Sequence, residues 1–434
     1  RMNTPPIQAR YGVMFWCLFA LILVALPLAF PGAYALSLLS QMGIAILACL
    51  SYQLLLGQGG LLSFGHAIFT GSGGYVVVHA LVLATEGAHT WSAAWLVLLP
   101  VMGGLGAATL AALLGWLSTG RASTPFAMIT LGLGELVWAA SFMVPEVFGG
   151  EAGISVNRLM TQAVGPFSLG PQIQLYGLIA VYLLGSAWLL IAFTRTPLGL
   201  LLNASRDDAT RVAYLGFNPR VIRYAAFITA GFFAGVAGGL SALNFEFISS
   251  DVFSLQRSGA YLLFTFIGGS SLFYGPVIGG VLMVAGLVWL SELTPGWLLY
   301  LGLLFVIVVM FVPGGLSGGV TRWWQIRVRE GWWFVVRAGL GVCAALPPTL
   351  GTIMLIEMLY HHALVRDGGV ATTMVRLGVS LDIAQAANWW LFICCTPVLF
   401  WLCRRAWAGL GLLGDQGSQT APSAAARPDQ GGQL

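Results

Sequence analysis

The chain has 434 residues, of which 58% are hydrophobic and only 8% are charged, and its formal net charge is +4. A soluble domain carries about 25% charged residues, so this composition excludes a protein with a wholly water-facing surface. Apolar runs recur from end to end, and each is long enough to cross about 30 Å of hydrocarbon as a helix. The sequence therefore predicts an all-α protein, a polytopic membrane helical bundle whose surroundings are a lipid bilayer and not nucleic acid.

Twelve apolar segments are expected to be membrane helices, about ten in a core and two in a C-terminal extension. They lie at residues 11–30, 34–56, 62–84, 94–117, 124–144, 173–193, 224–245, 258–273, 275–291, 297–313, 333–360 and 389–410. The pair 258–273 and 275–291 forms either two spans or a re-entrant pair, because the first is short and Gly275-Pro276 is typical of a turn. The polar, low-complexity stretch 412–434 is expected to be a disordered cytoplasmic tail.

The positions of the arginines indicate which side of the membrane each connecting segment faces. With the N-terminus inside, fifteen arginines fall on the cytoplasmic side and four fall outside. The outer four are Arg158, Arg257, Arg366 and Arg376. This asymmetry is the positive-inside bias, so we expect both termini in the cytoplasm and the chain in a bacterial cytoplasmic (inner) membrane.

The chain has no lysine, and all nineteen of its basic residues are arginine. A phosphate-binding loop of the form G-x-x-x-x-G-K-[ST] requires a lysine, so the chain lacks this motif. We therefore expect no cofactor on this chain and no enzymatic activity, and any ATP and Mg²⁺ that drive its work would bind to separate ATPase subunits. The six cysteines lie in apolar runs without the spacing of metal ligands, so no metal site is expected.

A charged island stands out in residues 203–224, which contain four arginines and two aspartates. A serine N-cap with an acid three residues later, an acid–arginine pair at i,i+4 and a glycine stop predict a cytoplasmic helix of about ten residues. The residues expected to form it are Ser205, Arg206, Asp207, Asp208, Arg211 and Gly216. The island could simply orient the chain, but a capped helix with a small-residue face favours docking to another protein over lying on lipid.

Polar groups at membrane depth are the other candidate functional residues. Ser63, His66 and Thr70 are expected on one face of the third span, where they either line a solute path or bond between helices. Glu135 lies near the middle of the fifth span, where an ionisable group is costly. We expect it to be satisfied internally or protonated, in preference to lining the path. Gly231, Gly235 and Gly239 form two consecutive G-x-x-x-G steps, which allow close contact between helices.

Several stretches, taken in order, resemble the LivM-type permeases, which are membrane subunits of ABC importers for branched-chain amino acids and related solutes. They are Gly57–Ala67, with the pattern G-Q-x-G-L-x-S-x-G-H-A, Thr130–Glu135, with T-L-x-x-G-E, the loop 196–219, the turn Gly268–Gly279 and Pro313–Leu316. Two positions depart from the family pattern. Ala209–Val212 replaces its E-x-A-A core, and Ser271 replaces a glycine.

The resemblance implies a domain plan and a set of partners. Residues 11–316 would be the permease core and 332–411 a two-helix extension. The loop 196–219 would couple the core to two cytoplasmic ABC ATPase subunits. A homologous second permease subunit would complete the solute path, and an external substrate-binding protein would dock on the side of residues 145–172. Branched-chain amino acids are the expected solutes, with urea or short amides as the alternative.

Three rival classes fit the sequence less well. An ion-coupled secondary transporter would need several coupling carboxylates or paired broken helices, and this chain offers one deep carboxylate and no clear internal repeat. A membrane-embedded enzyme would need a catalytic motif such as H-E-x-x-H or G-x-S-x-G. A passive channel would need a ring-forming selectivity filter. Co-purification discriminates, because an importer subunit should bring down ATPases through residues 196–219.

Overall fold

A computed structural model describes residues 12–86, 93–158, 170–312, 314–330, 332–366, 373–376, 379–382 and 385–409. The expected tail 412–434 and Pro313 lie outside these residues. The chain divides into two compact units, Arg1–Val320 and Thr321–Leu434. Helices make up nearly all of the described structure, so the prediction of an all-α, polytopic helical bundle is confirmed.

The helices of the first unit follow the apolar segments of the sequence. They are α1 (Gly12–Ala29), α2 (Ala33–Gln53), α3 (Ala67–Glu86), α4 (Ala93–Ser118), α5 (Thr124–Met143), α6 (Pro145–Phe148), α7 (Gln172–Arg195), α8 (Pro197–Asp207), α9 (Ala209–Tyr214), α10 (Pro219–Phe245), α11 (Leu255–Gly268), α12 (Gly275–Val284), α13 (Leu290–Leu293) and α14 (Trp297–Phe311). Helix α15 (Gly315–Glu330) runs from the first unit into the second. A π-helical turn, Leu54–Gln58, prolongs α2, and another, Ala285–Trp289, joins α12 to α13. A 3₁₀ turn, Ser250–Phe253, precedes α11.

Eight helical segments in the described part of the chain are long and apolar enough to cross a membrane. They belong to α2, α3, α4, α5, α7, α10, α12–α13 and α16. The bent pair α14 and α15 would make a ninth, whereas α1 and α11 have shorter apolar stretches. The count of about ten core helices is thus approximate, and the expected span 258–273 shortens to the 14 residues of α11.

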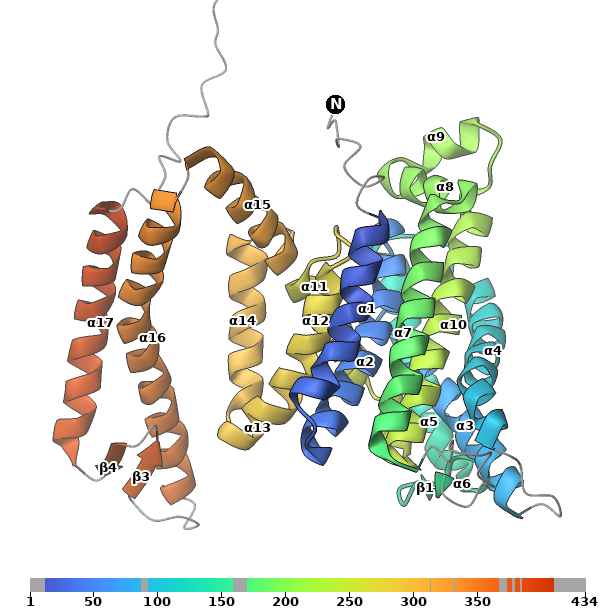
Figure 1. Ribbon diagram of the computed structural model, residues 1–434, viewed down its shortest axis with the longest axis horizontal. Coiled ribbons are helices and arrows are strands. Elements are labelled where there is room, and N and C mark those ends of the chain that lie inside the picture. Colours follow the sequence, from blue (N-terminus) through green and yellow to red (C-terminus); the bar gives the residue numbers. More distant parts are fainter. Residues whose placement is uncertain are drawn as a thin grey trace, which may run out of the picture. The chain divides into compact units, whose positions relative to one another are not determined.

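Helix α10 packs against α2, α3 and α4 and stands between α7 and α4 in the view of Figure 1. Three glycines from three helices allow a close approach, because Gly73 of α3, Gly103 of α4 and Gly235 of α10 meet backbone to backbone. A Cβ atom on Gly231 or Gly239 would also collide with α4 or α3. The prediction that the G-x-x-x-G steps let helices approach closely is therefore confirmed.

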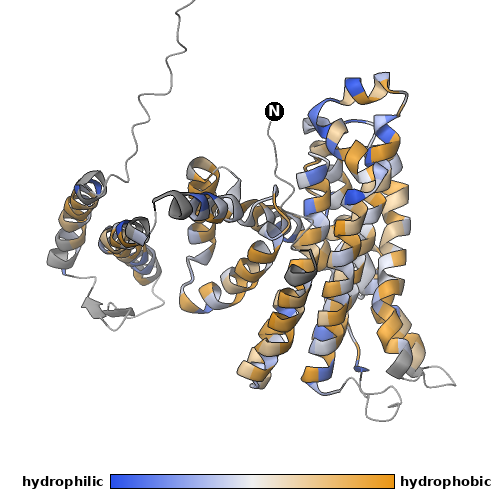
Figure 2. Cartoon of the chain, turned by 45° about the horizontal axis from the view of Figure 1, so that its top comes forward, coloured by the Kyte–Doolittle hydropathy of each residue, from blue (hydrophilic) through white to orange (hydrophobic). Residues whose placement is uncertain are grey.

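The two ends of this bundle differ in character. Helices α8 and α9 stand together at one end, which we call the α9 end, and α6 and strand β1 (Ile154–Ser155) lie at the other, the β1 end (Figure 1). Strand β1 pairs antiparallel with β2 (Phe247–Ile248), with Ile154 opposite Ile248. Hydrophobic residues run along the length of the helices, whereas hydrophilic residues gather around α8 and α9 (Figure 2). This is the pattern expected of a bundle surrounded by lipid.

The third predicted span, 62–84, begins too early. Residues 61–66 are not helical, and α3 starts at Ala67. Backbone groups in this break are satisfied by distant side chains, since Phe64 N donates to Thr130 Oγ1 at 3.1 Å and Tyr52 Oη donates to the Ser63 carbonyl at 3.0 Å. Hydropathy does not detect such a break, because Leu61, Leu62 and Phe64 continue the apolar run of the sequence.

The second unit contains α16 (Trp332–Arg366) and α17 (Ala386–Gly409), with a hairpin of β3 (Thr373–Arg376) and β4 (Val379–Asp382) between them. The buried side chains of Met354 and Met358 on α16 pack against Trp389 and Phe392 of α17. This unit thus has a small hydrophobic core of its own.

Candidate functional site

The charged island forms two short helices instead of one. Thr196 caps α8 by accepting a hydrogen bond from Gly199 N, and Pro197 occupies its first turn. Ser205 is buried inside α8 and is not an N-cap. The expected helix start at Ser205 is therefore wrong, because the Thr-Pro pair begins a helix earlier.

Asp208 is the residue that caps α9. Its carboxylate accepts hydrogen bonds from the backbone N–H groups of Thr210 and Arg211 at 3.0 and 3.1 Å and from the Thr210 hydroxyl. The Thr210 hydroxyl, followed by the backbone amide of Arg211, lowers the pKa of Asp208. Arg211 pairs with Asp208 at 3.5 Å, and Asp207 pairs with Arg206 at 3.2 Å, so the expected Asp207–Arg211 pair is wrong.

The predicted glycine stop is confirmed. Gly216 has φ +88°, and its N–H donates to the Ala213 carbonyl at 3.0 Å. Phe217 N donates to the Val212 carbonyl at 3.3 Å, which completes the pair of bonds of a Schellman motif. Helix α9 is therefore fixed at both ends, although it has six residues where about ten were expected.

Apolar and aromatic side chains are exposed at the C-terminal end of α9 and directly after it, whereas Thr210 and Arg211 are exposed earlier in the helix. Tyr214, Leu215 and Phe217 are 91%, 68% and 49% exposed, and we call these three residues the α9 patch. The expected stripe of small residues, Ala209, Val212, Ala213 and Gly216, is only partly exposed, because Ala213 and Gly216 are exposed but Val212 is buried. An exposed cluster of this kind on a rigid element is typical of a protein-binding surface.

Helix α8 is joined to the bundle by polar contacts that the sequence did not reveal. Arg206 donates through Nη1 to the carbonyl of Gly57, and Asn203 donates through Nδ2 to Gln58 Oε1. A Cβ atom on Gly60, whose φ is +62°, would lie 2.7 Å from Arg206 Cγ, so glycine allows the arginine to pass. Arg206 is thus a structural link between the α9 end and the chain beyond α2.

The segment Gly57–Ala67 is where the family-like motifs meet. Gln53 Nε2, just before it, donates to the Ser270 carbonyl at 3.3 Å in the glycine-rich turn. Ala67 N donates to Ser258 Oγ of α11 at 3.0 Å. The turn itself continues the contact, because a Cβ atom on Gly315 would lie 2.5 Å from Gly269 Cα. The structure therefore brings motifs from four parts of the sequence into one connected region.

The polar residues predicted on one face of the third span do not share a helix face. His66 precedes α3, and its Nε2 lies 2.9 Å from Ser51 Oγ of α2. Thr70 lies on α3 and donates to the Ala67 carbonyl at 3.0 Å. Within the described residues, Ser63 Oγ and His66 Nδ1 are buried and have no hydrogen-bond partner. Ser63 and His66 therefore belong to the break and not to a helical stripe.

Glu135 is half-buried on α5, and its carboxylate has no hydrogen bond or ion pair to any residue in the described parts of the chain. The expectation that it is satisfied by a neighbouring hydroxyl or carbonyl is therefore not met within these residues. Only 22% of the membrane-spanning window of α5 is buried, the lowest share among the eight candidate spans.

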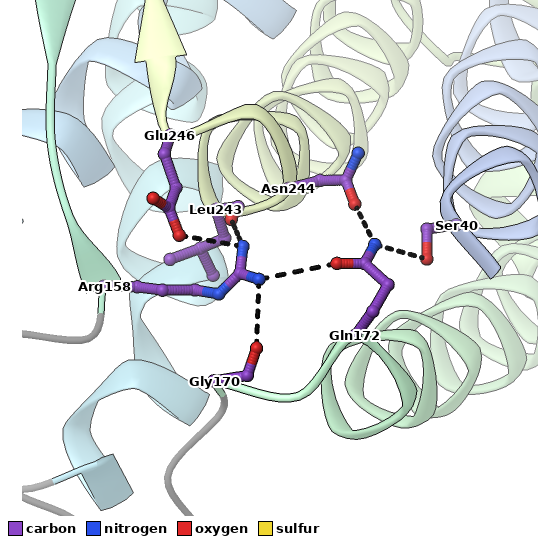
Figure 3. A network of polar contacts seen from close by, with 7 residues as sticks. All are labelled: Ser40, Arg158, Gly170, Gln172, Leu243, Asn244 and Glu246. Carbon is purple, nitrogen blue, oxygen red and sulfur yellow. Dashed lines mark hydrogen bonds and ion pairs between the residues drawn. The ribbon is translucent and has the colours of Figure 1, made fainter. Parts of the chain in front are cut away.

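At the β1 end, Arg158 organises a network that sequence reasoning missed (Figure 3). Its Nη1 donates to the Leu243 carbonyl at 2.8 Å and pairs with Glu246 Oε1 at 3.1 Å. Its Nη2 contacts Gln172 Oε1 at 3.4 Å, and Gln172 Nε2 in turn donates to Asn244 Oδ1 at 3.0 Å. The network joins the loop after β1, the start of α7 and the end of α10, so it braces this end of the bundle.

A cavity of about 480 Å³ opens beside the last turns of α10. Its walls come from α2, α3, α10, α11 and the segment 247–252. The polar lining includes Thr70, Ser241, Asp251 and Arg257. The volume is within the range of small-molecule sites, about 300–1,000 Å³.

Together these features define a multi-pass membrane protein with a solute-sized cavity near one end and a rigid surface helix at the other. Residues 34–313 match the family described as branched-chain amino acid transport system / permease component. The match covers more than half of the chain, and the chain belongs to this family of ABC transporter permeases. The resemblance to LivM-type permeases is thereby confirmed.

Two curated relatives are similar over most of their length. The high-affinity branched-chain amino acid transport system permease protein LivM of Escherichia coli (strain K12) is 28% identical over 340 residues, which cover 72% of this chain and 77% of that protein. The protein of the same name from Salmonella typhimurium (strain LT2) is 27% identical, with the same coverage. No solved structure matches the chain.

Proposed function

We propose that the chain is the permease subunit of an ATP-driven importer that carries branched-chain amino acids into the cytoplasm. The α9 end lies in the cytoplasm and docks on one of two ABC ATPase subunits. The β1 end faces outward and receives an external substrate-binding protein. A homologous second permease subunit completes the solute path in the inner membrane. The excess of arginines on the side of the α9 end supports this orientation.

The observation that carries the proposal is the α9 patch on a helix fixed at both ends. A helix that transmits force must not fray, and the Asp208 cap and the Gly216 stop restrain both ends of α9. Tyr214, Leu215 and Phe217 then offer an aromatic and aliphatic surface of the kind enriched at protein interfaces. A loop that only oriented the chain would need neither feature.

The contacts of α8 supply a route from the ATPase to the solute path. Arg206 holds the carbonyl of Gly57, and the segment Gly57–Ala67 contacts α5, α11 and the glycine-rich turn. Thr70, on the first turn of α3 directly after this segment, lines the cavity. A displacement of α8 would therefore reach the cavity wall through a few directly bonded residues.

The position of Glu135 favours a contact between α5 and the second permease subunit. A carboxylate at membrane depth without a partner is costly, and a second polypeptide can supply a hydrogen-bond donor. Helix α5 has the least buried membrane window of the unit, so it offers a free face for such a contact.

Co-purification with the ATPases tests the proposal. Leu215→Ser removes part of the α9 patch, and Met143→Ser is the matched control, because Met143 is an exposed apolar residue at the other end of the bundle. We expect Leu215→Ser to reduce both the recovered ATPase and the ATP-dependent uptake of leucine, and Met143→Ser to leave both unchanged. Uptake by the chain alone, driven by an ion gradient, would show instead an ion-coupled secondary transporter.

A further inference from the structure

The cavity beside α10 contains two side chains of opposite charge. Asp251 lies in the 3₁₀ turn before α11, and Arg257 lies in the first turn of α11. Both line the same space, but no ion pair joins them. Within the described part of the chain, neither the carboxylate nor the guanidinium has a hydrogen bond or an ion pair with any other side chain. Two opposite charges are thus held apart in one cavity and free to bind a ligand.

Orientation in the membrane does not explain Arg257. It is one of only four arginines on the side that the sequence assigns to the exterior, where the positive-inside rule disfavours arginine. It is also half-buried, so part of its hydration is lost without an ion-pair partner to replace it. An arginine that is costly in both respects is better explained by a ligand than by topology.

The rest of the lining is mainly apolar and contains small residues. Ile44, Ala237 and Val252 contribute aliphatic surface, and the backbone of α10 comes close to the cavity at Gly238. Tyr261 adds an aromatic ring to the lining, and Ser241 adds a hydroxyl. The cavity therefore combines a charged pair with a surface suited to a branched aliphatic chain.

The Arg158 network keeps the wall of this cavity in place. Asn244 and Glu246 belong to the network, and Phe245 and Phe247, which alternate with them in sequence, line the cavity. The end of α10 therefore carries residues bonded to Arg158 and Gln172 (Figure 3), and between them residues that line the cavity. A binding site gains specificity when its wall is fixed in this way.

We propose that this cavity binds a free amino acid as its zwitterion. Arg257 holds the α-carboxylate, Asp251 accepts hydrogen bonds from the α-ammonium group, and the side chain of the solute packs on Ile44, Ala237 and Val252. The assignment rests on the proposed import function and adds the chemistry by which the permease itself recognises its solute. Urea and short amides lack both charges, so they would bind far more weakly.

Equilibrium binding of radiolabelled leucine to the assembled complex in lipid nanodiscs, without the external binding protein, tests the assignment. Arg257→Gln and Asp251→Asn should each weaken leucine binding about tenfold or more, because each removes a charge-assisted hydrogen bond. Arg121→Gln and Glu151→Gln are the controls, since both residues are exposed and lie outside the cavity. These two variants should leave leucine binding unchanged.

Ligands with one charge separate recognition from a general effect on folding. Leucinamide has no carboxylate, so its binding should not respond to Arg257→Gln. The anion 4-methylpentanoate has no ammonium group, so its binding should not respond to Asp251→Asn. Urea should not displace leucine. No leucine binding by the wild-type complex, or equal leucine binding by all variants, would overturn the assignment, as would displacement by urea.

The outcome also separates this inference from the proposed function. If the complex hydrolyses ATP and imports leucine while the cavity variants bind leucine normally, only the zwitterion site is wrong. If leucine binds as expected but no ATPase associates with the chain, the import function is wrong and the site remains.

Discussion

Close packing of α3, α4 and α10 gives a sharp prediction about glycine. In Gly73→Ala, the new Cβ atom would lie 2.5 Å from Gly235 Cα and 2.7 Å from the Gly235 carbonyl carbon, whereas ordinary contact begins at 3.4 Å. Both contacts are to backbone, so no side chain can rotate away, and the helices must separate by about 1 Å. Overpacking of this kind costs about 1–3 kcal/mol, offset by up to about 1 kcal/mol from the better helix propensity of alanine.

Gly177→Ala on α7 is the matched control, because a Cβ atom there meets nothing within 4 Å. It should be neutral or stabilise the protein by up to about 1 kcal/mol. We expect Gly73→Ala to lower the free energy of unfolding by about 2 kcal/mol, measured by SDS titration in mixed micelles. If Gly73→Ala is as stable as Gly177→Ala, the reasoning from close backbone contact is refuted.

Three further predictions concern other parts of the chain. Arg158→Ala should lower the free energy of unfolding by about 3 kcal/mol, because it leaves Glu246 without its ion-pair partner. Glu246→Gln should lower the free energy of unfolding less, because the amide oxygen can still accept a hydrogen bond from Arg158. Hydrogen exchange in α9, corrected for intrinsic rates, should stay constant from neutral pH to about pH 5 and accelerate only in stronger acid. The reason is that the pKa of Asp208 is lowered, so the cap is lost only when pH falls through that lowered value. Acceleration of the exchange near pH 6 would contradict this. In the second unit, Met358→Ala should lower the free energy of unfolding by about 2–5 kcal/mol, because the side chain of Met358 is buried. Leu359→Ala, at an exposed neighbouring position, should lower it much less. Equal losses in the two variants would show that the α16–α17 contact is absent.

The sequence predicted the helices and the glycine stop because both depend on local chemistry. Apolar runs and G-x-x-x-G spacing are visible in the chain itself, and Gly216 adopts the positive φ that a helix stop favours. The earlier start of α8 was also visible, since Thr196-Pro197 is a cap followed by proline at the first helical position.

Other features depend on residues far apart in the sequence. The break before α3 exists because Thr130 and Tyr52 satisfy its backbone groups, and no local pattern reports those bonds. The Arg158 network joins a loop to the ends of two helices, so its members could not be associated from spacing. The cavity likewise required the fold, because Asp251 and Arg257 line it together with Ile44 of α2, Thr70 of α3 and the end of α10.

The central claim is that the α9 patch touches an ATPase in the cell, and photo-crosslinking from position 214 tests it most directly. Tyr214 is 91% exposed, so a photoreactive phenylalanine can replace it without disturbing the core. In irradiated inner membranes that import leucine, we predict a covalent adduct between this position and the ATPase subunit, and none from the same residue at position 143. Leucine import at the normal rate with no adduct from position 214 would contradict the account.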